Sequence, residues 1–486
     1  MAKKRLNSVV GIDIGSQNIK VAEIRNTGRE VVVNALGVAP TPDNMVDHNG
    51  VYDEDSIATV IKQLCSSAGV STKDAVYSIA GQASILVRTL EVPRQSTTEL
   101  KAHMEWEIGR NQPFAETTVQ SAYDFFEPED PNATNMDVVM AIGAQSAVDT
   151  LMSIAKKSQR GAYAIDVEPL AIARNLKVTH DSPQDVVCFI EMGHKSTSIN
   201  VYKDGQLLLP RQVPMGGDNF TQAIAGALNI SVEDAEALKI AKSLIPDSAG
   251  TMQGDPFGMM NPFGDPNETQ SFQPYNPFAD DMLAAPVPTS DPTPEPTSGS
   301  AYGYNPFSSE ADASAAPPTD AAAAGAYGYN PFGEADQAAT PPSDDPYAQA
   351  PVDAPFESDA NFATDSGADM PVVANAPASV ASMDPESERV YTAISAELDE
   401  FASEVRRSID YFRSKGGDVT RIYMGGGSSK MNGMIEYISR VTGISAELYD
   451  PLQGLPLAGK RLDMSMIDQH RADFTVAVGN GLHIVF

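Results

Sequence analysis

The sequence predicts an α/β fold made of two related halves, with a small α+β subdomain inserted in the first half and a long disordered insertion in the second. Three observations support this prediction. Strand-like and helix-like segments alternate along most of the chain, which is typical of α/β proteins. The pattern strand, acid-x-Gly turn, strand, turn, strand occurs at residues 8–39 and again at residues 185–217. Residues 247–384 differ in composition from everything around them.

The first half opens with three apolar runs separated by tight turns, which we interpret as a meander of three strands. An amphipathic pattern then predicts a helix that ends near Gly69, because glycine favours helix termination. The predicted strands span residues 8–15, 18–25, 30–39, 74–81, 83–93, 123–128 and 136–145, and the predicted helices span residues 54–68, 97–111 and 147–159.

The second half repeats the opening strands and continues with helices, which we expect at residues 219–229, 230–245 and 387–413. The last of these carries an apolar stripe at three- and four-residue steps, as an amphipathic helix requires. Its members are Val390, Ile394, Leu398, Phe401, Val405 and Ile409. Because the insertion lies between the last two helices, we expect it to interrupt one subdomain rather than separate two domains.

The insertion at residues 247–384 holds 21 of the 35 prolines and 21 acidic residues, but no Lys or Arg. Such a composition buries too little apolar surface to offset the entropy of ordering the chain, so we predict disorder. The segment AYGYNPF occurs at 301–307 and again at 326–332. These aromatic motifs are either partner-binding sites or the result of sequence expansion with no selected partner, and the sequence leaves both open.

Charge and composition exclude several classes of function. The chain has a net charge of −32, and without the 21 acids of the insertion this charge is −11. Such an acidic protein is not expected to bind nucleic acid through its phosphates. Two cysteines, Cys65 and Cys188, cannot form a disulfide framework and fit a reducing compartment. No signal peptide or long apolar segment is present, so we expect a cytoplasmic protein.

The two acid-x-Gly turns are candidate phosphate-binding elements. Asp13 precedes Gly15 in the first turn, and Glu191 precedes Gly193 in the second. A glycine without a Cβ lets backbone N–H groups approach an oxyanion. A carboxylate beside it repels phosphate but can hold Mg²⁺ through water. The structural alternative is that the glycine supplies a positive φ and the acid caps the turn.

A third glycine-rich element lies in residues 418–443, where Gly425, Gly426 and Gly427 end an apolar strand and precede a helix. Bare backbone at this point accommodates a flat ring such as a nucleobase. One glycine-rich turn is a weak signal, but this chain also carries two acid–glycine hairpins. Together the three elements predict a site for a polyphosphate and an adjoining nucleobase.

In this order the three motifs resemble the phosphate-1, phosphate-2 and adenosine motifs of the actin-like ATPase superfamily, whose fold consists of duplicated ribonuclease-H-like domains. The segment AIDVEPLAIAR at 164–174 resembles the first connecting helix of that superfamily. The resemblance implies ATP and Mg²⁺ as cofactors, and it implies that Glu168 orients the attacking water. An acid followed by proline is equally natural at a helix N-terminus.

Within the superfamily, several segments resemble the family of the cell-division protein FtsA and the pilus protein PilM, and its PilM branch above all. Among them are residues 92–114, 213–228 and 404–413. This resemblance implies a cytoplasmic ATP-binding scaffold of a type IV pilus or related secretion machine. It also implies docking to the cytoplasmic tail of a PilN-like inner-membrane protein, at the inner face of that membrane. Other pilus-machine subunits are further expected partners, and a homo-oligomer is left open.

The resemblance assigns site residues motif by motif. Glu168 is the expected catalytic residue, and Asp13 and Glu191 are the expected metal-site residues. The expected cofactor-binding residues are Asp13, Gly15, Ser16, Gln17, Lys20, Gly193, Lys195, Ser196, Thr197, Gly216, Gly217, Glu236, Lys239, Gly425, Gly426 and Gly427. Because the family usually has Asp where this chain has Glu191, we expect weak ATP hydrolysis at most.

The same resemblance sets the expected domain boundaries. The first nucleotide-binding subdomain comprises residues 1–75 and 161–184, with the small subdomain at 76–160 inserted into it. The second nucleotide-binding subdomain comprises residues 185–229 and 418–486. A helical subdomain comprises residues 230–246 and 385–417, on either side of the insertion at 247–384.

Two other functions remain open at this stage. A small-molecule kinase has the same superfamily fold, but no further acid-bearing motif offers a catalytic base for an acceptor hydroxyl. A cell-division protein like FtsA ends in a basic amphipathic membrane helix. Residues 474–486, FTVAVGNGLHIVF, are instead predicted to close the chain as a strand.

Overall fold

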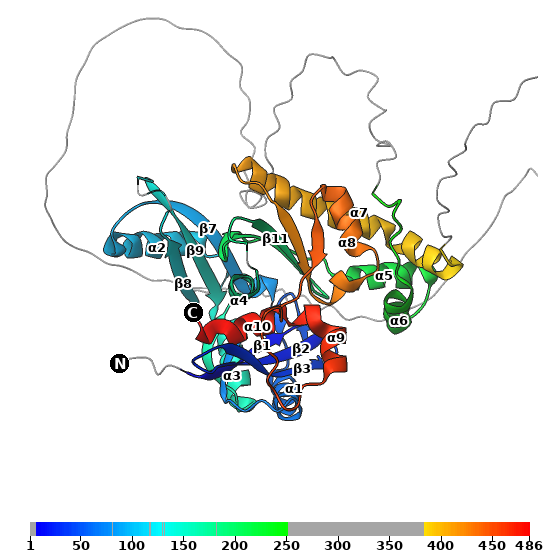
Figure 1. Cartoon of the computed structure of the whole chain (residues 1–486), viewed down its shortest axis with the longest axis horizontal. Helices are drawn as coiled ribbons and strands as arrows, with labels where there is room; N and C mark the ends of the chain where they lie inside the picture. The colour runs from blue at the N-terminus through cyan, green and yellow to red at the C-terminus, as the bar shows by residue number, and fades with distance from the viewer. Residues whose placement is uncertain are drawn as a thin grey trace, which may run out of the picture. The chain divides into compact units, whose positions relative to one another are not determined.

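The computed structural model describes residues 6–250 and 383–486, apart from residues 80, 116, 117, 129, 131 and 181. Two sheets with the same topology form its framework (Figure 1). The first has the strand order β3-β2-β1-β6-β10 and the second the order β13-β12-β11-β15-β16. In each, an antiparallel meander is extended by two strands parallel to its first strand. The predicted duplication is therefore confirmed.

The strands match the predicted runs closely. The first sheet contains β1 (Ser8–Ile14), β2 (Asn18–Asn26), β3 (Val31–Pro40), β6 (Asp74–Ser78) and β10 (Gly161–Asp166). The second contains β11 (Val186–Met192), β12 (Thr197–Lys203), β13 (Gln206–Leu209), β14 (Gln212–Val213), β15 (Arg421–Gly425) and β16 (Ala446–Leu448). A small hairpin joins β4 (Val46–Asp47) to β5 (Gly50–Val51).

β1 is apolar along most of its length because helices cover both faces of the first sheet. Val10 and Ile12 pack into the core formed with α1 (Glu54–Ser67) and α3 (Gln145–Lys157). On the other face, α10 (Thr475–Gly481) packs against β1 and against α4 (Glu168–Thr179).

The C-terminal segment differs from the prediction. Residues 474–486 are not a strand: they form α10 and the 3₁₀ turn η4 (Leu482–Ile484), after α9 (Met464–His470) and η3 (Arg471–Phe474). Their alternating Val and Ala residues resemble a strand, but the glycines allow a helix to pack closely. A Cβ at Gly479 would lie 2.0 Å from the carbonyl oxygen of Ala171. The segment 418–486, which we expected in the second subdomain, is therefore shared between the two sheets. Its strands β15 and β16 belong to the second sheet, and its last helices pack on the first.

The inserted subdomain is a three-stranded antiparallel sheet of order β7-β9-β8, which packs against α2. Its elements are β7 (Ile85–Pro93), α2 (Thr97–Asn111), β8 (Val119–Phe126) and β9 (Asn135–Ala144), with η1 (Gln82–Ser84) before them. Ser96 and Glu99 form a capping box at the start of α2. α3 and residues 76–78 of β6, which we expected in this subdomain, belong to the layers of the first sheet.

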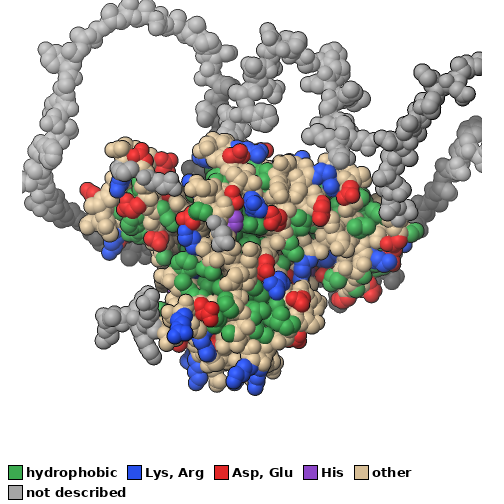
Figure 2. All heavy atoms as spheres, in the orientation of Figure 1, with side chains coloured by type: hydrophobic (Ala, Val, Ile, Leu, Met, Phe, Trp, Pro, Cys, Tyr) green, Lys and Arg blue, Asp and Glu red, His purple; other side chains and the backbone are tan. Residues whose placement is uncertain are grey.

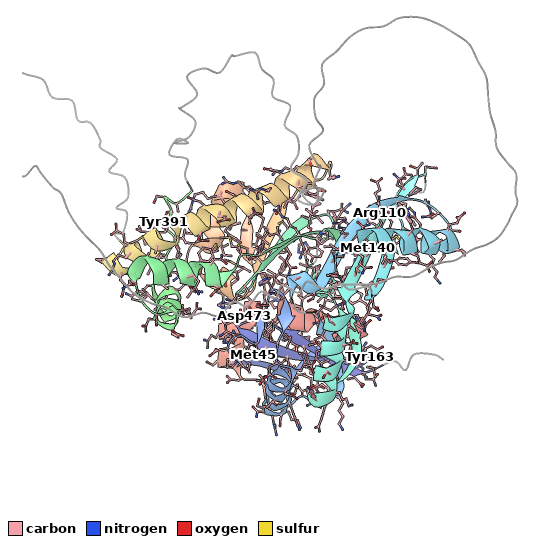
Figure 3. The ribbon with its side chains drawn as sticks, turned by 180° about the vertical axis from the view of Figure 1, so that it is seen from behind. Met45, Arg110, Met140, Tyr163, Tyr391 and Asp473 are labelled. Atoms are coloured by element: carbon pink, nitrogen blue, oxygen red, sulfur yellow. The ribbon has the colours of Figure 1, made fainter. Side chains whose placement is uncertain are left out.

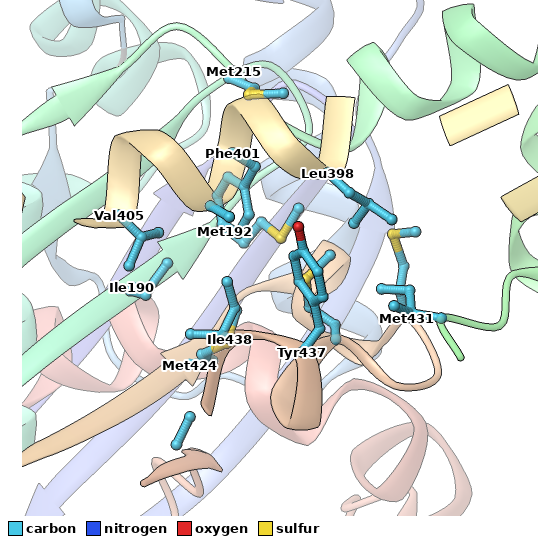
Figure 4. Packing of buried hydrophobic residues seen from close by; sticks show 14 of the residues in the cluster. Ile190, Met192, Met215, Leu398, Phe401, Val405, Met424, Met431, Tyr437 and Ile438 are labelled. Atoms are coloured by element: carbon cyan, nitrogen blue, oxygen red, sulfur yellow. The ribbon is translucent and has the colours of Figure 1, made fainter. Parts of the chain in front are cut away.

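Three helices pack on the second sheet: α5 (Gly217–Leu228), α6 (Val232–Lys242) and α7 (Pro385–Ser414). η2 (Gly427–Lys430) and α8 (Met434–Thr442) follow β15. All six residues of the predicted stripe on α7 are buried. Figure 4 shows Phe401 and Val405 of α7 above Met192 and Ile190 of β11. Packing of this stripe explains why residues on both sides of the insertion belong to one subdomain.

The predicted insertion at 247–384 lies almost entirely outside the described residues, which end at Gly250 and resume at residue 383. Its first residues are nevertheless packed: Ala249 is buried, and its carbonyl oxygen accepts a hydrogen bond from Nε of Arg440 at 2.7 Å. Asp384 caps the N-terminus of α7. Among the described residues, no helix has the length and apolar character needed to cross a membrane.

Candidate functional site

The two acid-x-Gly turns have the same backbone geometry. In the β1–β2 hairpin the N–H of Gly15 donates to the carbonyl oxygen of Asn18 at 3.1 Å, and in the β11–β12 hairpin Gly193 donates to Ser196 at 3.0 Å. Neither glycine has a positive φ. A Cβ would lie 2.7 Å from the oxygen of Asn18 in the first turn and 2.8 Å from that of Ser196 in the second. Close approach inside the turn therefore requires glycine at both positions.

The tips of both turns carry available backbone donors. The N–H groups of Ser16, Gln17 and Lys195 form no hydrogen bond within the described part of the chain. Neighbouring N–H groups at a tight turn form a concave binding site for an oxyanion. The first turn presents two such groups in succession, those of Ser16 and Gln17.

Cross-strand pairing gives the two acids different partners. Asp13 lies opposite Lys20, whose Nζ is 2.9 Å from Oδ2 of Asp13, and both side chains are largely buried. Glu191 lies opposite Ser198, whose hydroxyl donates instead to the carboxylate of Glu168. Oε2 of Glu191 is buried and has no hydrogen-bond partner among the described residues. The first turn is thus neutralised, whereas the second holds an acid with an unpaired oxygen.

Electrostatic interactions connect the two turns. Burial acts to lower the pKa of Lys20, but the ion pair with Asp13 more than offsets this, and the charge of Glu191 adds to the rise. Burial raises the pKa of Glu191 well above its ordinary value, and the charge of Glu168 acts in the same direction. Burial also raises the pKa of Glu168 to about 7. The charges of the two turns therefore influence one another.

The expected metal-site residues, Asp13 and Glu191, differ in availability. Asp13 is occupied by the ammonium group of Lys20, whereas Glu191 has a free oxygen. In residues 6–250 and 383–486, as far as they are described, no group of three or more His, Cys, Asp or Glu side chains is arranged to hold a metal ion. Mg²⁺ keeps several waters and needs few protein ligands. Of the two acids, Glu191 is the one that would hold Mg²⁺ through water.

The glycine-rich loop after β15 packs against the second turn. A Cβ at Gly425 would lie 2.4 Å from Oε2 of Glu191, and a Cβ at Gly426 would lie 2.4 Å from the carbonyl oxygen of Met192. Gly426 also has a φ of +82°. At Gly427, by contrast, the nearest atom to a Cβ is 3.8 Å away. Packing explains the first two glycines, so only Gly427 presents the open backbone that we expected of all three.

The start of α5 holds the second turn in place. The N–H of Gly217 donates to the carbonyl oxygen of Gly193 at 3.0 Å, and the N–H of Asp218 donates to that of His194 at 2.8 Å. The ammonium group of Lys195 lies 2.7 Å from the carboxylate of Asp218. We expected Gly217 and Lys195 to contact the cofactor. Instead, the N–H of Gly217 and the ammonium group of Lys195 both bond to protein atoms that hold the second turn.

Two more expected cofactor residues have packing partners within the protein. A Cβ at Gly216 would lie 2.5 Å from the carbonyl oxygen of His194, so the helix can approach the turn only with glycine there. The hydroxyl of Thr197 is buried and donates to the carbonyl oxygen of Met215 at 2.7 Å. Both residues fix the second turn rather than offer a free polar group.

Lys239 and Glu236 of α6 form a buried cluster beside α5. Nζ of Lys239 donates to the carbonyl oxygen of Gly217 at 2.9 Å and to the hydroxyl of Thr221 at 2.7 Å. It also lies 2.7 Å from Oε2 of Glu236. Burial acts to raise the pKa of Glu236, but the charge of Lys239 leaves it lowered. Oε1 of Glu236 accepts a hydrogen bond from Nε2 of Gln17 at 3.3 Å, which joins the first turn to α6.

The sequence analysis missed Asp473 of η3, which is labelled in Figure 3. Its buried carboxylate lies 2.9 Å from Nζ of Lys430 and 2.8 Å from Nδ1 of His470, and its charge raises the pKa of Lys20. A Cβ at Gly427 would have the carboxylate of Asp473 as its nearest neighbour, at 3.8 Å. The i, i+3 spacing of His470 and Asp473 is a helical signal, which the strand interpretation of the following residues concealed.

Comparisons with known proteins agree with this architecture. The family model of the type IV pilus assembly protein PilM matches residues 11–260, slightly more than half of the chain. The model of the cell division protein FtsA matches residues 188–479. The two matches overlap in the second sheet.

Curated relatives are distant. FtsA of Bacillus subtilis is 23% identical over 253 residues, which cover 47% of this chain and 57% of that protein. FtsA of Porphyromonas gingivalis is 26% identical over 265 residues, which cover 49% of this chain and 54% of that protein. The chain thus spans little more than half the length of these relatives.

Among solved structures, a PilM–PilN type IV pilus biogenesis complex matches with a TM-score of 0.63 at 18% identity, covering 99% of this chain and 100% of that chain. This similarity shows the fold, which is the actin-like ATPase fold with its two duplicated domains. With a family model that matches more than half of its residues, the chain belongs to the PilM family of type IV pilus assembly proteins.

Proposed function

We propose that this protein is an ATP-binding scaffold of a type IV pilus or related secretion machine, and that it docks the cytoplasmic tail of a PilN-like inner-membrane protein. Membership of the PilM family supports the proposal, as does the match to a PilM chain solved in complex with PilN. Docking to such a tail places the protein at the inner face of the inner membrane.

One observation carries the nucleotide-binding part of the proposal: Gln17 at the tip of the first turn bonds at 3.3 Å to Glu236 of α6, which packs beside the start of α5 that holds the second turn. The N–H groups of Ser16 and Gln17 and the ammonium group of Lys20 suit the oxygens of a polyphosphate. Glu191 suits water-coordinated Mg²⁺, which supplies the positive charge that a triphosphate needs beside carboxylates.

Glu168 is the proposed orienting residue for water. Its carboxylate accepts a hydrogen bond from Ser198, and its pKa of about 7 leaves it partly protonated at neutral pH. A protonated carboxylic acid cannot take a proton from water. Together with Glu at position 191, this supports at most weak ATP hydrolysis and a role in which bound ATP stabilises one conformation.

Thermal denaturation with and without ATP and Mg²⁺ tests the nucleotide site. At a hundredfold excess of ATP over Kd, binding stabilises the folded protein by about 2.7 kcal/mol, which raises Tm. Lys20→Met should abolish this rise, whereas Lys101→Met, on the exposed side of α2, should retain it. A wild-type protein with no ATP-dependent rise refutes nucleotide binding.

A peptide with the sequence of a PilN-like cytoplasmic tail from the same genome tests the partner. Fluorescence anisotropy should show saturable binding of this peptide, and a scrambled peptide should not bind. Equal signals from the two peptides refute specific docking.

The match to the FtsA model supports a second candidate, a cell-division protein. A fluorescent fusion expressed in the native cell separates the two. Localisation with the pilus machine supports the proposed scaffold, and localisation at division sites supports the second candidate.

A further inference from the structure

The end of the first sheet that lies opposite the Gly15 turn is rich in basic residues. β1, β6 and β10 begin there and β2 ends there, since Ser8 pairs with Arg25 and Gly161 pairs with Asp74. Figure 2 shows Lys and Arg side chains gathered over the lower part of the view, which holds the first sheet and its helices. We call this surface the basic end; it comprises Arg25, Arg29, Lys73, Arg160 and Arg461.

Three arginines surround the loop between α1 and β6. Arg25 donates to the hydroxyl of Ser71 at 3.1 Å, and Arg160 donates to the carbonyl oxygen of Thr72 at 3.1 Å. The side chain of Arg461 packs against Gly69 on the other side of the loop. Lys73 at the end of this loop is exposed, as is Arg29 in the turn between β2 and β3. The positive charges therefore converge from four separate segments.

Few acids oppose these charges. Glu23 is fully buried beneath the loop, where it accepts hydrogen bonds from Ser8, Asn34 and Ser71, and its carboxylate lies 3.8 Å from the guanidinium group of Arg25. Glu30 and Asp74, which adjoin Arg29 and Lys73 in the sequence, and Asp463, two residues after Arg461, are exposed acids. The local charge is positive in a chain whose net charge is −32.

We propose that the basic end binds the surface of an anionic phospholipid membrane. Charge complementarity favours a negatively charged surface, and screening confines the interaction to side chains within about 10 Å, so acids elsewhere on the chain do not prevent it. A membrane on this end leaves the Gly15 turn, at the opposite end of β1, facing away from the lipid.

The basic end alone is expected to bind the membrane weakly, and a second contact of the protein at the same membrane is expected to strengthen this binding. Each basic side chain near an anionic surface contributes about a fivefold gain in affinity. A second contact of the same protein with an inner-membrane partner raises the effective concentration of the lipid, so both contacts strengthen each other. The lipid contact itself does not depend on the proposed partner or on ATP.

Co-sedimentation of the full chain with vesicles tests the proposal. We expect binding to vesicles that contain one third phosphatidylglycerol, no binding to pure phosphatidylcholine vesicles, and loss of binding as salt rises from about 50 to 500 mM. The double variant Arg29→Glu/Lys73→Glu should lower the affinity more than about twentyfold. The control Lys101→Glu/Lys415→Glu, with the same net charge, should bind like wild type, and all variants should retain the wild-type Tm.

Three results overturn the proposal. They are the absence of binding to anionic vesicles, equal losses in the test and control variants, and binding that appears only after residues 251–382 are removed. The last result assigns the basic end to the chain's own acidic segment instead. None of these results bears on nucleotide or tail binding, which vesicle-free assays measure.

Discussion

The side-chain amide of Gln17 donates a hydrogen bond to Oε1 of Glu236 at 3.3 Å and so connects the tip of the first turn to α6. Lys239 and Thr221 hold the other oxygen of Glu236. Both oxygens are therefore engaged without a ligand. A nucleotide hydroxyl that bonds to Glu236 has to displace the amide of Gln17.

Gln17→Ala should therefore loosen the contact between the first turn and α6. We expect faster amide hydrogen exchange in residues 232–242 without nucleotide, because α6 loses its contact with the first sheet. ATP association, measured by stopped-flow fluorescence, should become several-fold faster. Ser16→Ala, in the same turn, is the control for exchange in α6. Unchanged exchange together with slower association would show that Gln17 serves the bound nucleotide and not the contact between the first turn and α6.

Glu168 should make stability depend on pH. Its pKa is about 7 in the folded protein against 4.5 for an ordinary Glu, so the folded state retains a proton that the unfolded state releases. The stabilising contribution is complete below pH 4.5 and is lost as pH rises through 7, on the order of 3 kcal/mol in all. Tm of the wild type should fall across this window, and Glu168→Gln should reduce the slope. Equal slopes for both proteins would contradict the raised pKa.

Adjacent glycines in the loop after β15 should respond differently to substitution. Gly426→Ala places a Cβ 2.4 Å from the carbonyl oxygen of Met192 at a positive φ, so Tm should fall by several degrees. Gly427→Ala meets no atom within 3.4 Å and should leave Tm unchanged, but it should weaken ATP binding at least tenfold if the nucleotide lies on this backbone. Calorimetric titration with ATP measures the second effect, and wild-type affinity in Gly427→Ala removes this loop from the site.

Replacing residues 251–382 by a short Gly-Ser linker should leave Tm and ATP binding close to those of the wild type. The flanking segments contact each other directly, because Nζ of Lys242 lies 3.6 Å from Asp384 and 3.3 Å from Glu386. Loop-closure entropy changes slowly with loop length. A longer deletion, of residues 247–384, also removes buried Ala249 and the Asp384 cap, so it should be less stable by about 1–3 kcal/mol. Equal stability of the two deletions would place the boundary at residue 247 after all.

Local patterns in the sequence predict much of this fold. The repeated acid-x-Gly hairpins predict the duplicated sheets, and the stripe from Val390 to Ile409 predicts the buried face of α7. The C-terminal helix was mispredicted because Val476, Ala477 and Val478 alternate like a strand. Only its neighbours show that glycines let it enter the space between α4 and β1.

The site was predicted at the level of motifs and less well at the level of atoms. The charge of Asp13 contributes to the raised pKa values of Glu168 and Glu191, and their joint role at a nucleotide stays a prediction. Spacing alone could not show that Lys20 pairs with Asp13, or that Gly216 and Gly426 are needed for contacts with protein atoms. The Lys20–Asp13 pair depends on the register of the β1–β2 hairpin, and the contacts of Gly216 and Gly426 involve residues more than 20 positions away.

A double-mutant cycle for ATP affinity tests most directly whether the turns of both sheets bind one nucleotide. Lys20→Met alters the first turn and Glu191→Gln the second, and isothermal titration with ATP and Mg²⁺ gives the Kd of each variant. We predict that each substitution weakens binding at least tenfold, and that the double variant departs from additivity because the two side chains act on one ligand. Wild-type affinity in either single variant would contradict a shared site.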